Sequence, residues 1–249
     1  MTYTERVVNM QSPMCRRERA QMKKFFSTLN LQKNPNANMT TLYELDESCG
    51  FEKNIRTCNP IMPFLLNNVE KDERIALYLI MCKGDGEYAV YSGKERAYVD
   101  IDDVVVTQHK ANYEKELSEI KMAKGGFDCE IIPIELDGNS NRSYLKLARD
   151  IMSCISDGDI VFMDVTFGFK PVSVIQFIAL NYAYKIRRNV EIGSLSYGSH
   201  YGTRNHVDKI YNLTAFFLLH NLMGNISGME HPEMLIDKLI ADMIAEGES

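Results

Sequence analysis

The stretch Ile160-Val161-Phe162-Met163-Asp164-Val165 decides the fold class of this chain. A continuous apolar run of this length is typical of a strand that is buried on both faces, as in parallel sheets of α/β proteins. Residues 166–171 add a threonine, a glycine and a lysine, and residues 172–186 have the composition of a helix. The stretch therefore predicts a strand, a polar turn and a helix in succession.

The same alternation extends outward from this unit in both directions. Residues 16–29 are predicted to form a basic helix, because their apolar side chains recur at roughly helical spacing. Residues 5–11 are the candidate first strand, with a disordered N-terminus as the alternative. The other expected strands are 39–45, 74–81, 129–136, 190–195 and an edge strand at 209–213, and the other expected helices are 60–69, 113–123, 141–155, 215–223 and 233–246.

Strands that alternate with helices through short connections indicate a parallel, doubly wound sheet. We therefore predict an α/β, Rossmann-like fold with a mostly parallel sheet flanked by helices and a short helical C-terminal extension. The predicted division is a ligand-binding domain over residues 1–214 and a helical segment over 215–249.

Composition and charge limit the possible functions. The 249 residues are 45% apolar and 25% charged, as in ordinary globular proteins, and the net charge is -6. A general nucleic-acid-binding surface would need a basic balance, so we see no strong nucleic-acid signal. The basic face of residues 16–24 could contact DNA, but a solvated helix face explains it better. A pocket for a small anionic ligand remains compatible with the charge.

The N-terminus and the cysteines suggest where the protein works. Residues 1–20 do not resemble a signal peptide, and the apolar segment 213–223 is shorter than the roughly 20 residues that span a bilayer. The six cysteines form no C-x-x-C pair and no zinc-ligand spacing, so we expect buried free thiols in a reducing cytoplasm. No metal, cofactor or membrane is expected.

Polar residues gather where the strand 160–165 ends. In doubly wound sheets, ligands bind beyond the carboxyl ends of the strands, near the point where the strand order reverses. Gly168 allows a close backbone approach, the first N–H groups of the next helix are free to bind phosphate, and Lys170 adds a cation. Asp164 and Thr166 supply hydrogen-bonding groups there. The alternative is that Asp164 and Thr166 only shape the turn between strand and helix.

Two further segments are candidates for the same edge. Residues 196–202 follow a predicted strand and offer Tyr197 for stacking on a base and Gly198 for close approach, although an ordinary loop would look similar. Gln11 and Ser12 would lie at the end of the candidate first strand. No P-loop motif is present, and residues 83–87 lack the third glycine of a dinucleotide fingerprint.

Residues 159–170 resemble the signature of CRISPR-associated Rossmann-fold (CARF) domains, in which a buried strand ends in Asp-hydrophobic-Thr-His-Gly-Phe-Arg. Residues 41–66 are similar to the hairpin and helix that follow the first strand of the family. Residues 189–198 resemble its next strand and Tyr-Gly turn, and residues 210–214 resemble its Tyr-Asp-Leu-Thr segment. The resemblance covers about residues 5–220.

This resemblance implies a homodimeric sensor of cyclic oligoadenylates, with the ring bound across the two-fold axis. The residues that it places in the pocket are Gln11, Ser12, Asp164, Thr166, Gly168, Phe169 and Lys170. Some family members also cut their ring, and Thr166 and Lys170 are the catalytic candidates for such ring-nuclease activity. A nucleotide-binding α/β enzyme or regulator outside the family is the further alternative.

The chain departs from the family pattern at three positions. Phe167 stands where the family has His, Lys170 where it has Arg, and Asn212 where it has Asp. Lysine keeps the charge but loses the bidentate fork, so the first two changes affect ring cleavage more than binding. Family members usually carry a C-terminal output domain, and about 30 residues follow the last motif here. We therefore expect a stand-alone sensor with a separate effector partner, or the sensor part of a longer protein.

Overall fold

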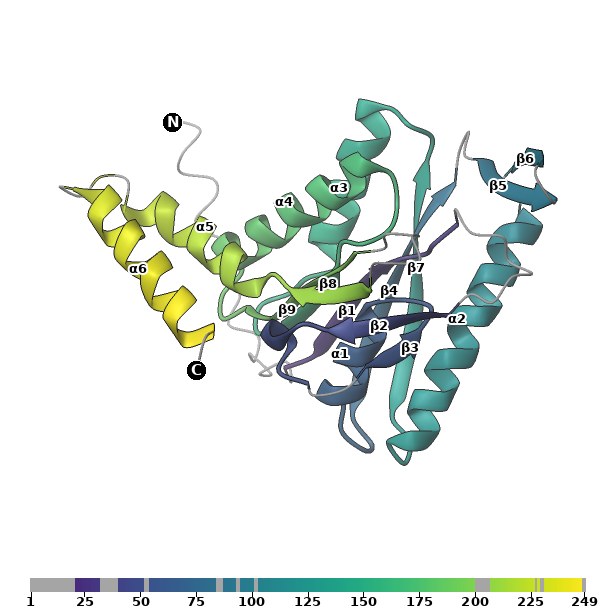
Figure 1. Ribbon diagram of the computed structural model, residues 1–249, viewed down its shortest axis with the longest axis horizontal. Coiled ribbons are helices and arrows are strands. Elements are labelled where there is room, and N and C mark those ends of the chain that lie inside the picture. Colours follow the sequence, from purple (N-terminus) through teal and green to yellow (C-terminus); the bar gives the residue numbers. More distant parts are fainter. Residues whose placement is uncertain are drawn as a thin grey trace, which may run out of the picture.

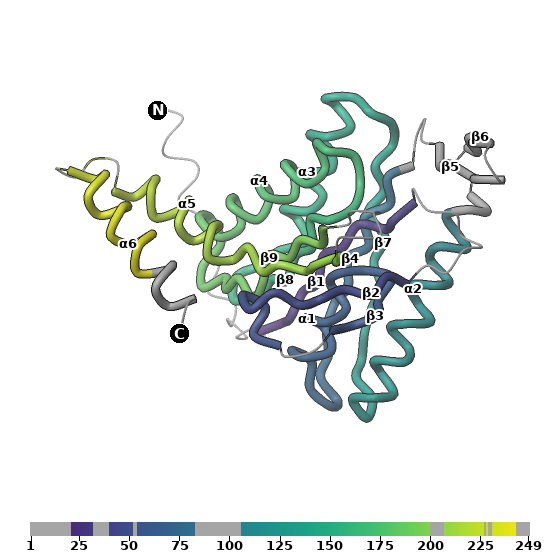
Figure 2. Tube along the Cα trace, in the orientation of Figure 1, coloured from purple at the N-terminus to yellow at the C-terminus, as the bar shows by residue number. Residues whose placement is uncertain are grey.

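A computed structural model describes residues 21–31, 40–51, 54–83, 87–92, 95–100, 103–199, 207–226, 228 and 231–247. Its main feature is an eight-stranded sheet with the strand order β3-β2-β10-β9-β8-β1-β4-β7. Helices cover the two faces of the sheet, and two further helices extend from one end (Figure 1). The chain trace in Figure 2 shows the same arrangement. Strands from the early part of the chain lie beside strands from its later part in one sheet.

Five neighbouring strands form the parallel part of the sheet. They are β1 (Lys23–Thr28), β4 (Arg74–Lys83), β7 (Asp128–Asp137), β8 (Ile160–Asp164) and β9 (Glu191–Ser199). The chain proceeds outward from β1 through β4 to β7 and then returns to β8 on the other side of β1. The strand order therefore reverses between β1 and β8, which confirms the Rossmann-like α/β prediction.

Three strands complete the sheet beside β9. Strand β10 (Asp208–Asn212) is antiparallel to β9, β2 (Thr41–Leu45) is parallel to β10, and β3 (Ile55–Thr57) is antiparallel to β2. The expected β2–β3 hairpin is confirmed. The prediction that residues 209–213 form an edge strand is wrong, because this hairpin pairs with the outer side of β10. A separate hairpin of β5 (Glu87–Ser92) and β6 (Glu95–Asp100) was not predicted.

The helices divide the apolar core into two layers. One layer contains residues of α1 (Ile61–Asn68) and α2 (Asp103–Ala123), and the other contains residues of α3 (Asn141–Ser153) and α4 (Lys170–Ile186). Helix α5 (Thr214–Ile226) adds to the second layer, and α6 (Pro232–Gly247) packs on α5. The predicted two-helix extension is thus present. Ser140 is the N-cap residue of α3, and its side-chain oxygen accepts a hydrogen bond from the backbone N–H of Ser143.

The prediction of a helix over residues 16–29 is wrong where the structure describes it, because residues 23–28 form the central strand β1. Phe25 and Phe26 are both 0% exposed and lie on opposite faces of the sheet. Phe25 stacks on Phe162 and Phe26 stacks on Tyr78, each with ring centroids 4.5 Å apart. Two consecutive buried aromatics fit a strand that is covered on both faces. The candidate first strand at residues 5–11 lies outside the described residues.

Two further observations concern membrane-spanning helices and the cysteines. No helix in the described residues is both long and apolar enough to cross a bilayer. The five cysteines of the described ranges are free thiols, and Cys49 and Cys82 are buried. Burial raises the pKa of each of these two thiols to about 11, so both are protonated near neutral pH.

Candidate functional site

The predicted polar turn lies at the reversal point of the strand order, between the carboxyl ends of β1 and β8. Gly168 adopts φ +101°, a conformation that favours glycine. A Cβ atom on Gly168 would lie 3.1 Å from Cγ2 of Thr28 and 3.3 Å from Cβ of Val172. The glycine therefore lets the loop after β8 pack closely against the end of β1 and the first turn of α4.

A chain of hydrogen bonds links this loop to β9. The Thr166 hydroxyl donates to Oδ1 of Asp164 at 2.5 Å, and the backbone N–H of Gly198 donates to the Thr166 hydroxyl oxygen at 2.7 Å. The Ser196 hydroxyl lies 3.4 Å from the same Asp164 oxygen. Asp164 is fully buried and Thr166 is half-buried. Asp164 therefore fixes the position of the Thr166 hydroxyl, and Thr166 is the more exposed of the two residues.

Burial dominates the electrostatics of Asp164. It raises the pKa of the carboxyl from its ordinary value of 3.8 to about 7, against the opposing effect of the hydrogen bonds from Thr166 and Ser196. Within the described part of the chain, Oδ2 has no hydrogen-bond partner. The pKa of Tyr43 and that of Tyr113 are also raised, chiefly by burial and to a smaller extent by the nearby Asp164 charge.

Helix α4 begins with features that suit an anion. Its N-cap residue, Phe169, makes no side-chain capping hydrogen bond, and the first turn contains no acidic residue. Lys170, the first residue of the helix, is exposed, whereas Phe169 is half-buried against the second core layer. The Ser173 hydroxyl donates to the backbone oxygen of Val165 and fixes the loop against the helix. Pro171 carries no backbone N–H and the Val172 N–H donates to the backbone oxygen of Phe169, so the Lys170 ammonium and the helix dipole are what can attract a phosphate at this helix end.

The structure corrects the expected position of Tyr197 and Gly198. Both residues lie within β9, which continues to Ser199, and not in a loop after it. Tyr197 is exposed and Gly198 is buried. A Cβ atom on Gly198 would lie 2.6 Å from Cγ of Pro60, so a larger residue here would push α1 away from the sheet. Gly198 therefore contributes to the site through its close packing against Pro60 and through the hydrogen bond that its N–H donates to Thr166.

The structure thus brings Asp164, Thr166, Gly168, Phe169, Lys170 and Gly198 together around one sheet edge, with Tyr197 on the neighbouring strand. Gln11 and Ser12 lie outside the described residues. Sequence reasoning missed Thr28, which ends β1 beside Gly168 and is fully buried. Its hydroxyl has no hydrogen-bond partner in the described ranges. The apolar run at residues 25–26 was the signal for the strand that carries Thr28.

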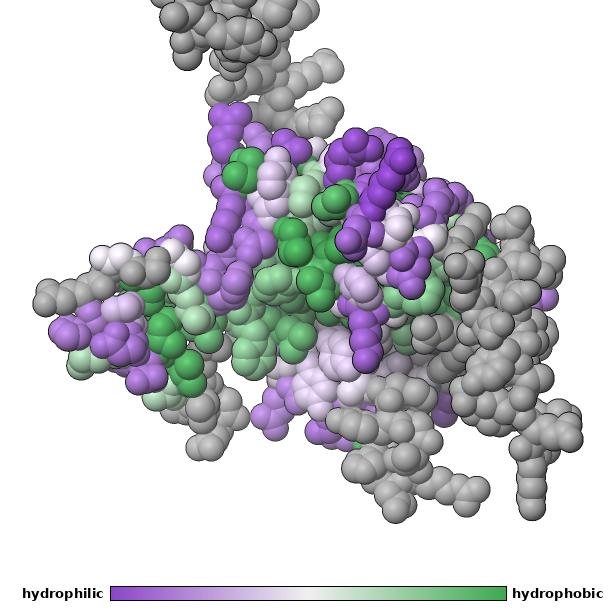
Figure 3. Space-filling model, turned by 90° about the horizontal axis from the view of Figure 1, so that it is seen from above, coloured by the Kyte–Doolittle hydropathy of each residue, from purple (hydrophilic) through white to green (hydrophobic). Residues whose placement is uncertain are grey.

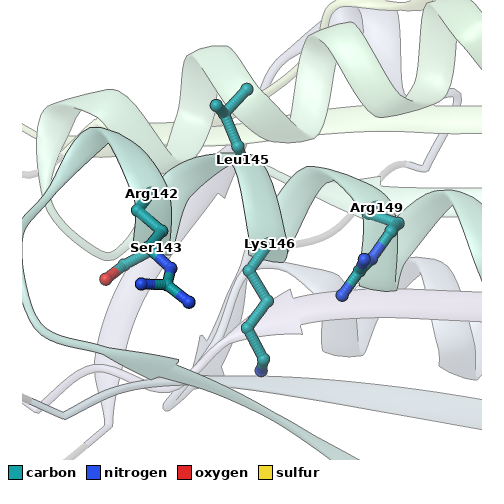
Figure 4. Close-up of a pocket in the computed structure, with 5 residues that line it drawn as sticks. All are labelled: Arg142, Ser143, Leu145, Lys146 and Arg149. Carbon is teal, nitrogen blue, oxygen red and sulfur yellow. The ribbon is translucent and has the colours of Figure 1, made fainter.

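An exposed apolar row runs along α4 beyond the site. Val174, Ile178 and Tyr182 are four residues apart, so they lie on one face of the helix, and all three are exposed. Figure 3 shows apolar side chains gathered in the middle of this side of the molecule. On α3, Leu145 is exposed and points away from Lys146 and its neighbours (Figure 4).

The opposite side of α3 is basic. Arg142, Lys146 and Arg149 line an open hollow of about 520 Å³, and their side chains project to the same side (Figure 4). Lys146 forms an ion pair with Asp150 at 3.1 Å. Because these side chains are exposed and flexible, a solvated helix face accounts for them.

The fold and the site together define an α/β protein of the Rossmann-like class with a cluster of polar residues at the reversal point of the strand order. No family model matches the chain. A comparison with curated proteins finds the CRISPR-associated protein MJ1674 of Methanocaldococcus jannaschii, which is 23% identical over 120 residues. The match covers 46% of this chain and 19% of the relative, so the chain spans only about a fifth of the length of that protein.

Proposed function

We propose that this chain is a sensor domain that binds a cyclic oligoadenylate, with cyclic tetra-adenylate as the first candidate, in type III CRISPR antiviral signalling. The observation that carries the proposal is the arrangement at the reversal point. There Thr166, Lys170 and the start of α4 lie at the carboxyl end of β8, and the buried Asp164 accepts the hydrogen bond of the Thr166 hydroxyl. The similarity to a CRISPR-associated protein and the resemblance of residues 159–170 to the CARF signature support the same assignment.

Each part of the ligand has a matching group in this site. The Lys170 ammonium and the positive end of the α4 dipole suit a phosphodiester. The exposed ring of Tyr197 offers a surface on which an adenine can stack. Gly168 and Gly198 let the loop after β8 and the end of β9 pack closely against their neighbours, which fixes the backbone at this edge.

The apolar row on α4 supports the expected homodimer. An isologous dimer needs one surface that can contact its own copy. Val174, Ile178 and Tyr182 form such a surface, and the row begins one turn after Lys170. A two-fold axis beside this end of α4 would bring two copies of the site together and form one shared pocket for a ring.

We expect Lys170→Ala to weaken the binding of cyclic tetra-adenylate by about tenfold to a hundredfold, because it removes the exposed cation from the start of α4. Isothermal titration calorimetry with cyclic tetra-adenylate and cyclic hexa-adenylate measures this. Lys115→Ala is the matched control, because Lys115 is an exposed lysine on α2, on the opposite face of the sheet. Failure of the wild type to bind either ring would reject the proposed function.

The same samples, analysed by chromatography, separate binding from cleavage. Linear product that accumulates with the wild type would assign ring-nuclease activity to the site. An ordinary mononucleotide that binds as tightly as the ring would favour a nucleotide-binding protein outside the CARF family.

We expect Ile178→Glu to convert the homodimer into a monomer and to weaken ring binding by about tenfold or more, because a charge would be buried without a partner in the apolar contact. Light scattering coupled to size-exclusion chromatography measures the number of chains. Met122→Glu is the control, because Met122 is an exposed apolar residue near the end of α2. An Ile178→Glu protein that remains a dimer would exclude this surface as the interface.

A further inference from the structure

The direction of the hydrogen bonds around Thr166 limits what this residue can bind. A threonine hydroxyl has one hydrogen to donate and two lone pairs that accept. The Gly198 N–H can only donate, so it occupies one lone pair of Thr166 at 2.7 Å. Oδ1 of the ionised Asp164 can only accept, so the Thr166 hydrogen points toward it at 2.5 Å. When Asp164 is ionised, these two partners fix the orientation of the Thr166 hydroxyl.

The Thr166 hydroxyl therefore has one lone pair left with which to bind a ligand. A phosphate oxygen in a phosphodiester carries no hydrogen and can only accept, so it cannot bond to this lone pair. A hydroxyl group of a ligand can donate to it. Thr166 is only half-buried, whereas Asp164 is fully buried, so Thr166 is the one of the two that a ligand could contact. The site therefore presents an acceptor at Thr166 and donors at Lys170 and the start of α4.

We infer that Thr166 accepts a hydrogen bond from a ribose 2′-hydroxyl and makes the site selective for ribonucleotides over 2′-deoxyribonucleotides. The inference rests on the proposed function. In a ring joined through 3′,5′ phosphodiesters, the 2′-hydroxyl is the sugar hydroxyl that stays free to donate a hydrogen bond. In this arrangement Asp164 and the Gly198 N–H are positioning groups, since both act on the ligand only through Thr166. The phosphates are left to the start of α4 and to Lys170.

Binding of two rings to three proteins tests this inference. The ligands are cyclic tetra-adenylate and its fully 2′-deoxy counterpart, and calorimetry gives the ratio of their dissociation constants. We expect the wild type to prefer the ribose ring by about tenfold, the size of one hydrogen bond. Thr166→Ser keeps the acceptor and retains the preference. Thr166→Val keeps the shape of the side chain but has no acceptor, so its ratio falls to about one.

The outcomes separate this inference from the proposed function. If the wild type binds both rings tightly and equally, the sensor assignment stands and the role of Thr166 is rejected. If Thr166→Val keeps the full preference, another group recognises the hydroxyl and the inference is again rejected. If the wild type binds neither ring, the proposed function fails and the inference fails with it. If thermal unfolding shows that Thr166→Val does not fold, Thr166→Ala, which also lacks the acceptor, takes its place in the comparison.

Discussion

Replacing Lys24 by methionine is expected to lower the free energy of unfolding by about 3–5 kcal/mol, because it leaves a buried carboxylate without its partner. Nζ of Lys24 lies 2.6 Å from Oδ2 of Asp159, and the two side chains are 9% and 6% exposed. The ammonium also donates to the backbone oxygen of Cys154 at 2.6 Å. This pair joins the start of the central strand β1 to the turn before β8.

Urea denaturation of the wild type and the Lys24→Met protein measures the loss. The matched control is Lys146→Met, which breaks the ion pair between Lys146 and Asp150 on the surface of α3. That pair is also within ion-pair range, with an N–O distance of 3.1 Å, but its side chains are 51% and 32% exposed. Exposed pairs contribute about 0–1 kcal/mol, so the control should change little. Equal effects of the two substitutions would show that burial of Lys24 is not what makes its ion pair important.

The same ion pair explains why the central strand β1 was predicted as a helix. Lysines next to apolar residues usually indicate a solvated helix face, and Lys23 and Lys24 precede Phe25 and Phe26. The partners of the two lysines, Glu73 and Asp159, are far away in the sequence. Strands β4 and β8 were predictable because their apolar runs are continuous, and α3 was predictable because its apolar residues recur at helical spacing.

Much of the candidate site was predictable because it is local. Asp164, Thr166, Gly168 and Lys170 lie within seven residues, and the rule that ligands bind at strand carboxyl ends places them at one edge. Thr28 was missed because its strand was predicted as a helix. The contact of Gly198 with Pro60 could not be predicted, because it depends on how β9 meets the start of α1. The effect of the Asp164 charge on the pKa of Tyr43 and on that of Tyr113 could not be predicted either, because both tyrosines come from distant elements.

Asp164 should make the folded protein less stable as the pH rises from about 4 to about 7. Its pKa is about 7 in the folded protein and has an ordinary value of 3.8, chiefly because the carboxyl is buried. Between these values the folded state holds a proton that the unfolded state has released. The contribution of Asp164 to stability is therefore most favourable below pH 4 and falls as the pH rises to about 7, by about 4 kcal/mol in total.

Substitution of Asp164 by asparagine isolates this effect. The amide oxygen can still accept the Thr166 hydroxyl, but it does not titrate. We expect the free energy of unfolding of Asp164→Asn, relative to the wild type, to be about 3 kcal/mol higher at pH 8 than at pH 5. Urea denaturation at the two pH values measures the difference.

The control substitution is Asp157→Asn. Asp157 is an exposed carboxyl whose pKa is lowered, chiefly by the backbone N–H of Arg188. It is therefore ionised in both the folded and the unfolded state between pH 5 and pH 8. The control should change the free energy of unfolding by the same amount at pH 5 and at pH 8. A difference between Asp164→Asn and the wild type that stays constant over this range would show that Asp164 is ionised throughout. The Asp164 proton would then have no part in setting the orientation of Thr166. The expected rise would instead mean that the acceptor role of Thr166, and with it the selectivity for a ribose hydroxyl, is fully developed only above about pH 7, where the carboxylate is ionised.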